Sequence, residues 1–312
     1  MGWGAILAQD GGGHLSHMTR RLLIASVLTL LGSGIACNKS GETPTSPSPA
    51  PTAGPIFYTA IGASDGIGFG SSSVCIPFSD CPDGAGYVQI LRRRLRDNSP
   101  GRVVEHANRS IPGAVLSRAI EDLAREVGTP ISDLAGNFIE RQAPFVPANT
   151  THVTIFAGGN DANVMGRAVL AGRGGSNPNG YIDTLVQQWG VDLVDLIARI
   201  RSRAPNTRIV ALNMINLAGA PYVASRPTSE RAIIQRIALG ISDQVNALTS
   251  RNVLVVDLMC DARLYQSQYY SSDGFHPGDS GYAVFAEAAY PALKDGVNNA
   301  PNTNCAHRRI IP

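Results

Sequence analysis

Hydrophobic residues gather in short runs, separated by longer stretches in which they recur every three or four positions. Five short runs from residue 56 onward are rich in apolar and β-branched residues, as expected for strands buried on both faces. They are Ile56 to Ile61, Arg102 to Ala107, His152 to Ala157, Arg208 to Asn213 and Val253 to Leu258. The helical stretches lie near Tyr87 to Arg96, Val115 to Val127, Tyr181 to Arg203, Ser229 to Leu248 and Ser280 to Leu293. This alternation predicts a single α/β domain over residues 56–312, with helices on both faces of a mostly parallel sheet.

The chain before residue 56 follows a different pattern. Arg20 and Arg21 precede a predominantly apolar run from Leu22 to Leu31, and small residues follow it. A basic pair, an apolar run and small residues are typical of a secretory signal, and the run is shorter than the roughly 20 residues of a membrane-spanning helix. We therefore expect residues 1–36 to be a signal peptide, with translation starting at Met18.

Cys37 lies where bacterial lipoproteins carry their lipidated cysteine. The Pro/Ser/Thr-rich residues 37–55 are too poor in apolar groups to fold, so we expect them to form a tether. Lipidation predicts a cell-envelope lipoprotein attached to a membrane, on the periplasmic or outer-membrane face. Gly34 stands where the lipoprotein pattern prefers Leu, so ordinary cleavage after Ala36 and secretion stay open as the alternative.

The chain has five cysteines, an odd number for an exported protein, and lipidation of Cys37 leaves four to form disulfides. Of the three possible pairings we expect Cys75 with Cys81, which bracket a short loop, and Cys260 with Cys305, which tie the C-terminal tail to the body. A zinc site is the competing use of cysteines, but the chain has no C-x-x-C pair. We expect no metal.

The charge and hydrophobic content of the chain indicate which kinds of partner to expect. The formal net charge of +2 is spread along the chain without a basic block, and 44% of the residues are hydrophobic. This profile is that of a globular protein and gives no reason to expect a nucleic-acid partner. We expect a monomer.

Polar residues that can carry chemistry follow the predicted strands, where parallel sheets bind their ligands. Ser64 lies between Gly62 and Gly66 directly after the first strand, where a sharp turn exposes its hydroxyl. After the second strand comes Gly113, whose small size lets a backbone N–H approach a ligand. Asn160 follows the third strand and carries an amide with two donors.

The strongest pair follows the fifth strand. Asp273 stands three residues before His276, so its carboxylate can accept the imidazole N–H and fix the tautomer, which leaves the other ring nitrogen as a base. His106, His152 and His307 have no acidic residue three positions before them, and we interpret them as ordinary structural or surface histidines.

These four stretches, in this order, resemble the conserved blocks of the SGNH, or GDSL, hydrolase family. The resemblance implies a flavodoxin-like three-layer fold with a five-stranded sheet and no cofactor. It implies that Ser64 is the nucleophile, that Asp273 and His276 complete a catalytic triad, and that the oxyanion hole is formed by the backbone N–H groups of Ser64 and Gly113 and the side chain of Asn160. Two departures concern the substrate: the first block reads Gly-Ala-Ser-Asp rather than Gly-Asp-Ser-Leu, and Ser110 stands where the second block often has a glycine.

The predicted function is therefore serine esterase or lipase activity on short to medium acyl esters or lipids. The same groups would serve a carbohydrate O-acetylesterase, and the sequence does not separate the two. A catalytically silent surface-binding lipoprotein is a third reading, against which the intact set of catalytic residues argues. The Gly/Asn-rich segment 172–180 is expected to be a surface loop or a flap over the substrate, and residues 172–189 are the candidate lid.

Overall fold

A five-stranded parallel sheet forms the centre of the domain in the computed structural model, which describes residues 54–129, 134–298 and 300–312. The predicted signal peptide, Cys37 and nearly all of the tether lie outside the described residues. The strands are β1 (Ile56–Gly62), β2 (Val104–Asn108), β3 (His152–Phe156), β4 (Arg208–Leu212) and β5 (Leu254–Val256). All five coincide with the predicted runs, and the α/β fold class is confirmed.

The strand order is β2-β1-β3-β4-β5, and every neighbouring pair is parallel. The chain therefore leaves β1 toward one edge to form β2 and then returns across β1 to form β3. After β1 the chain turns toward β2, and after β3 it turns the opposite way toward β4. A crevice forms between the carboxyl ends of two neighbouring strands whose connections diverge in this way. Ser64 follows β1 and Asn160 follows β3, so both lie at this switch point.

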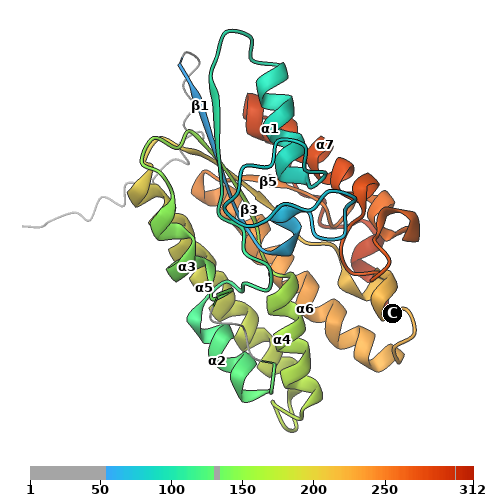
Figure 1. The fold of residues 1–312 in the computed structure, drawn as a ribbon. Helices are drawn as coiled ribbons and strands as arrows, with labels where there is room; N and C mark the ends of the chain where they lie inside the picture. The colour runs from blue at the N-terminus through green and yellow to red at the C-terminus, as the bar shows by residue number, and fades with distance from the viewer. Residues whose placement is uncertain (1–53, 130–133, 299) are drawn as a thin grey trace, which may run out of the picture. The chain divides into compact units, whose positions relative to one another are not determined.

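Helices cover both faces of the sheet (Figure 1). Helices α1 and α7 pack together on one face, whereas α5 and α6 lie on the other with α2, α3 and α4 beside them. The helices are α1 (Tyr87–Asp97), α2 (Arg118–Glu126), α3 (Phe138–Arg141), α4 (Gly159–Leu170), α5 (Pro178–Arg203), α6 (Thr228–Ala247) and α7 (Asp279–Asp295). Short 3-10 helices are η1 (Ser64–Ile67), η2 (Ala143–Phe145), η3 (Leu217–Gly219), η4 (Pro221–Val223), η5 (Leu248–Arg251), η6 (Ala262–Tyr265), η7 (Ser267–Tyr269) and η8 (Ala306–Arg309).

Helix α4 is the main element that the sequence pattern missed. Its first residues, Gly159 and Asn160, are poor helix formers. Ala162, Met165 and Val169 are buried on one face of the helix, so tertiary packing outweighs the weak local propensity.

Two predicted boundaries are wrong for local reasons. Helix α2 begins at Arg118 and not at Val115, because Val115 makes an isolated parallel bridge with Asn137. Helix α5 begins at Pro178, so the last residues of the expected loop 172–180 are helical. Asn177 caps this helix by accepting a hydrogen bond from the N–H of Gly180 at 3.0 Å, and proline is well suited to the first helical position.

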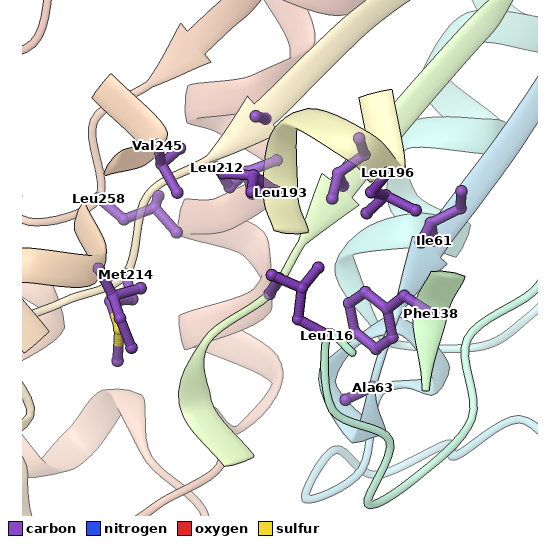
Figure 2. Packing of buried hydrophobic residues seen from close by; sticks show 14 of the residues in the cluster. Ile61, Ala63, Leu116, Phe138, Leu193, Leu196, Leu212, Met214, Val245 and Leu258 are labelled. Carbon is purple, nitrogen blue, oxygen red and sulfur yellow. The ribbon is translucent and has the colours of Figure 1, made fainter. Parts of the chain in front are cut away.

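The hydrophobic core lies on both sides of the sheet. Figure 2 shows Ile61 and Ala63 at the end of β1 close to Leu116 and Phe138. All of these side chains are buried, and a large apolar side chain contributes about 1.5–3 kcal/mol when it is fully buried. The turn that carries Ser64 is therefore built on the core, which restricts its movement.

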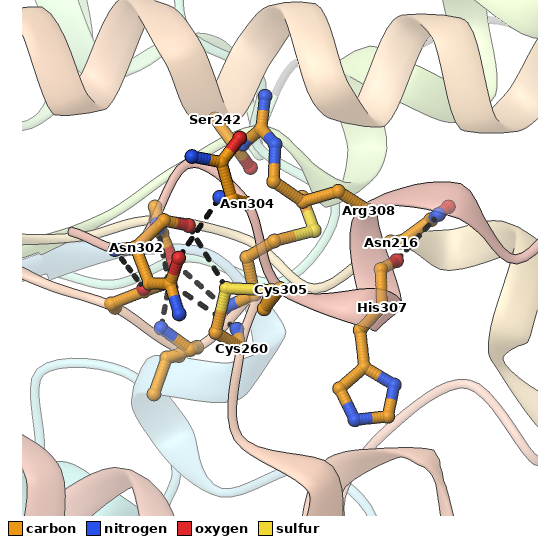
Figure 3. The surroundings of a disulfide bond; sticks show 12 residues. Asn216, Ser242, Cys260, Asn302, Asn304, Cys305, His307 and Arg308 are labelled. Carbon is orange, nitrogen blue, oxygen red and sulfur yellow. Dashed lines mark hydrogen bonds between the residues drawn. A yellow bond between two sulfur atoms is a disulfide. The ribbon is translucent and has the colours of Figure 1, made fainter.

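Both expected disulfides are present, Cys75 with Cys81 and Cys260 with Cys305. The second joins the segment after β5 to the C-terminal tail (Figure 3). Asn302 in the same tail donates its backbone N–H to Asp257 at 2.8 Å. The tail is thus held by a covalent bond and a hydrogen bond near the end of β5.

Candidate active site

The nucleophile candidate Ser64 opens the 3-10 helix η1, two residues after β1 ends, and is 6% exposed. As the first helical residue, its N–H has no acceptor within the helix. The strand end before it is fixed by Gln142, whose side chain accepts the N–H of Gly62 at 3.0 Å and donates to the carbonyl of Gly62 at 2.9 Å. Gln142 carries no local sequence signal, and its contact spans 80 residues.

The structure brings Ser64, His276 and Asp273 into one hydrogen-bonded line. The Nε2 atom of His276 lies 2.9 Å from Oγ of Ser64, and its Nδ1 atom lies 2.6 Å from Oδ2 of Asp273. With the proton on Nδ1, the carboxylate accepts it and Nε2 can accept the serine proton. This is the arrangement needed to activate a hydroxyl as a nucleophile.

The carboxylate of Asp273 is held by four donors. Besides the ring of His276, it accepts Oγ–H of Ser271 at 2.8 Å and the N–H groups of Phe275 at 2.8 Å and His276 at 2.9 Å. Partial burial raises the pKa of Asp273, but these hydrogen bonds outweigh it and lower the pKa to about 2. The carboxylate is therefore ionised at neutral pH and can hold the imidazole in one orientation.

The serine loop and the histidine loop pack directly on each other. Gly70 has a φ of +90°, and a Cβ there would lie 2.9 Å from the carbonyl oxygen of Pro277 and 3.0 Å from Cβ of His276. The ring of Phe69 lies 4.7 Å from the ring of His276. A side chain at position 70 would push the two loops apart, so we attribute the glycine to this close approach.

The two predicted oxyanion donors that follow β2 and β3 face one cavity. Gly113 (φ +81°) and Asn160, in the first turn of α4, both line a cavity of about 420 Å³. The Nδ2 atom of Asn160 donates to the carbonyl of Ala114 at 2.9 Å. Since an amide has two N–H groups, this bond orients the side chain and leaves one donor for a ligand.

Asp161 connects the two segments that carry these donors, and the sequence gave no indication of this role. Its Oδ1 atom accepts the backbone N–H of Leu116 at 2.8 Å and the indole N–H of Trp189 at 3.0 Å. The side chain is 1% exposed, and its Oδ2 atom has no hydrogen-bond partner. Burial raises the pKa of Asp161 to about 6, and the hydrogen bonds offset this only in part.

The departure from the family pattern at Ser110 is accommodated by close packing against the serine turn. A Cβ at position 66 would come within 1.9 Å of Oγ of Ser110, so only glycine fits at position 66. Asn108 holds both segments by donating to the carbonyl of Gly66 at 2.7 Å and accepting the N–H of Ser110 at 3.1 Å.

A second, smaller cavity of about 40 Å³ borders the site on another side. Its lining includes Asp65, which follows Ser64, and Phe275 and Pro277, which flank His276. Burial raises the pKa of Asp65, and the charge of His276 partly counteracts this. Asp65 stands where the family has leucine, so this wall of the site carries a carboxyl group in place of an aliphatic side chain.

His152 and His307 lie away from the candidate site. His152 begins β3, at the opposite end of the strand from Asn160, and its Nδ1 lies 2.7 Å from Oγ1 of Thr151. The ring of His307 stacks on Tyr265 at 4.2 Å. Within residues 54–129, 134–298 and 300–312, no cluster of acidic, His or Cys side chains is suited to hold a metal ion.

Residues 60–284 match the model of the GDSL-like lipase/acylhydrolase family. The chain belongs to this family. No curated protein sequence matches the chain significantly. The match spans the predicted nucleophile and the predicted base, so the family's ester-hydrolysing activity applies to the domain that contains both.

Solved structures confirm the fold of this GDSL-like hydrolase. A lipase from a goat rumen metagenome has 16% identity and a TM-score of 0.50, covering 76% of this chain and 97% of its own. A GDSL-like lipase from Parabacteroides merdae has 18% identity and a TM-score of 0.51, covering 78% and 96%. An acetyl xylan esterase from Geobacillus stearothermophilus has 15% identity and a TM-score of 0.50, covering 81% and 98%.

Proposed function

We propose that the chain is an exported carboxylic ester hydrolase in which Ser64 is the nucleophile, His276 the general base and acid, and Asp273 the group that orients the histidine. The observation that carries the proposal is the pair of contacts on the imidazole, 2.9 Å to Ser64 and 2.6 Å to Asp273. The ester substrate is a small molecule or a lipid.

In this mechanism His276 removes the proton of Ser64 as its Oγ attacks the ester carbonyl carbon. The N–H groups of Ser64 and Gly113 and the amide of Asn160 stabilise the oxyanion, since donors placed where charge develops each contribute about 3–4 kcal/mol. The protonated imidazole gives its proton to the leaving alcohol as the carbon–oxygen bond breaks. Water, deprotonated by the same histidine, then releases the acid from the acyl-enzyme.

Ser64→Ala tests the proposal, because it removes the attacking oxygen and leaves the fold intact. We expect loss of nearly all hydrolysis of 4-nitrophenyl acetate, while the circular dichroism spectrum and melting temperature stay close to wild type. Ser79→Ala, in an exposed loop, is the matched control and should keep full activity. Wild-type activity in the Ser64 variant would overturn the assignment of the nucleophile.

Deacetylation of carbohydrates is the second candidate. The cavity of about 40 Å³ beside Asp65 is small, with room for a few water-sized groups and hence for a short acyl chain. Among proteins of the same fold, one is an acetyl xylan esterase and another a lipase. If the acyl group of the substrate occupies this cavity, acetyl esters should be preferred.

A hydrolysis profile separates the two candidates. We expect a carbohydrate O-acetylesterase to release acetate from acetylated xylan and to lose activity steeply as the acyl chain of 4-nitrophenyl esters lengthens. A lipid or general esterase should tolerate longer chains and leave acetylated xylan unchanged.

Export through a signal peptide over residues 1–36 and attachment through a lipid on Cys37 belong to the same proposal. Both disulfides in the structure support an oxidising compartment. In the described residues no helix has the length and apolar character to span a membrane. Metabolic labelling with a fatty-acid analogue should mark the wild-type protein and not Cys37→Ser, and an unlabelled wild type would favour cleavage after Ala36.

A further inference from the structure

The larger cavity beside the oxyanion candidates carries two arginines, and we call it the arginine cleft. It has a volume of about 420 Å³, and its lining includes Gly113, Asn160, Arg167 and Arg226. Most of its other lining residues are apolar, and they include Ile234 and Phe275. The oxyanion candidates and the two arginines therefore border the same cavity.

Helix geometry relates the first arginine, Arg167, to the oxyanion candidate Asn160. Asn160, Asn163 and Arg167 all line the cleft, and their spacing of three and four residues places them on one face of α4. Seven residues of helix span about 10 Å. Asn160 and Arg167 therefore lie about two turns apart on the same face of α4.

The second arginine comes from a different segment. Arg226 follows η4 and precedes α6. The two walls are joined by Tyr222, whose hydroxyl donates to Oδ1 of Asn163 at 3.4 Å. The two guanidinium groups thus stand on separate elements around one cavity.

Among the described lining residues of the cleft, the charged side chains are both positive. Arg167 donates to the neutral hydroxyl of Thr129 at 3.3 Å. Arg226 pairs with Glu230 at 3.2 Å, but the pair lies at the surface, with side chains 44% and 31% exposed, and such a pair contributes little to stability. None of the described residues that line the cleft is acidic.

We propose that the arginine cleft binds an anionic group, a carboxylate or a phosphate, carried by the ester substrate. The inference rests on the proposed function, since the anion is placed relative to an ester held at Gly113 and Asn160. A guanidinium offers paired N–H donors that match the oxygens of either group. The substrate class is therefore an acidic ester, positioned by Arg167 and Arg226 and cleaved at Ser64.

Matched pairs of esters test the proposal. The first arm compares 4-nitrophenyl half-esters of succinate, glutarate, adipate and suberate with neutral 4-nitrophenyl esters of the same chain lengths. The second arm compares an acetyl ester of glycerol 3-phosphate with the acetyl ester of glycerol. The measured quantity is the ratio of kcat/KM for the anionic substrate to kcat/KM for its neutral partner.

We expect wild type to prefer the anionic substrate at one chain length or in the phosphate arm, and Arg167→Ala/Arg226→Ala to lower the ratio by about tenfold, as for loss of a charged hydrogen bond. Added salt should lower the wild-type ratio, because the arginines are exposed. Arg199→Ala, which removes an exposed arginine paired with Asp195 on α5, should leave the ratio unchanged.

A fall of the ratio in the first arm places the anion on the acyl side, and a fall in the second places it on the alcohol side. Unchanged ratios in both arms would overturn the proposal. Failure of the proposed function would give a different result, because Ser64→Ala would then hydrolyse every substrate as fast as wild type.

Discussion

Two aspartates of the site occupy opposite environments. Asp273, in the loop before α7, has a side chain 40% exposed and accepts four hydrogen bonds, and its pKa falls to about 2. Asp161, in the first turn of α4, is 1% exposed and has one oxygen without a partner, and its pKa rises to about 6. The same type of side chain thus stays ionised down to strongly acidic pH in one place, whereas in the other it takes up a proton near pH 6.

The difference follows from what each carboxylate contacts. In the proposed mechanism Asp273 faces an imidazole that gains a positive charge, and an ionised carboxylate is needed to stabilise that charge. Asp161 faces a backbone N–H and an indole N–H, and either protonation state of its carboxyl accepts such bonds. Orienting the base therefore needs a charge, whereas joining the two oxyanion segments needs only an acceptor.

Asp273→Asn should have the largest effect, because the amide can present its N–H₂ to Nδ1 and stabilise the wrong tautomer of His276. We expect kcat to fall by roughly 10³ to 10⁴, with KM nearly unchanged. Steady-state kinetics with 4-nitrophenyl acetate measure both constants. A loss below tenfold would mean that Asp273 does not orient the base.

Asn160→Ala should lower kcat by about a hundredfold or more, since it removes an oxyanion donor. Asn163→Ala, one helical turn further along α4 and in the same cavity, is the matched control and should change kcat far less. Equal losses in the two variants would indicate a general disturbance of the helix and no special role for Asn160.

Asp161→Asn should remove a pH dependence of stability. Since the folded pKa of about 6 exceeds the unfolded value of 3.8, the folded state binds more protons between these values. The free energy of unfolding should therefore fall as pH rises from about 4 to 6, by up to about 3 kcal/mol from this group. Urea unfolding across this range checks the expectation, with Asp195→Asn on the surface of α5 as a control that keeps the wild-type slope.

Asp273 should contribute with the opposite sign. Its folded pKa lies below the unfolded value, so its contribution is present above about pH 4 and is lost as pH falls toward 2. Unfolding of Asp273→Asn below pH 4 should therefore depend less on pH than unfolding of wild type. If the free energy of unfolding changed with pH in the same way in Asp161→Asn and Asp273→Asn, the two aspartates would not differ as described.

Ser271→Ala should have the smallest effect. It removes one of the four donors to Asp273, and an exposed hydrogen bond of this kind corresponds to a change in kcat of about fivefold. The same assays apply, with Ser79→Ala as the control. A loss as large as that of Asp273→Asn would assign Ser271 a direct part in the chemistry.

The strands, and the proximity of Ser64, His276 and Asp273, could be predicted from the sequence, whereas the residues that support this arrangement could not. The apolar runs indicated all five strands, and the polar residues after them indicated Ser64, Gly113, Asn160, Asp273 and His276. Gln142 and Asp161 act on residues that lie 80 and 45 positions away, and no local pattern encodes such contacts. Helix α4 was missed for a similar reason, because burial of one face overrides the weak propensity of its first turn.

The most direct test of the account is covalent labelling of the nucleophile. A fluorophosphonate probe should modify wild-type protein at Ser64, mapped by mass spectrometry, and the rate of labelling should collapse in His276→Ala. Labelling at another residue, or labelling of Ser64 at the same rate without His276, would contradict the claim that this serine is activated by this histidine.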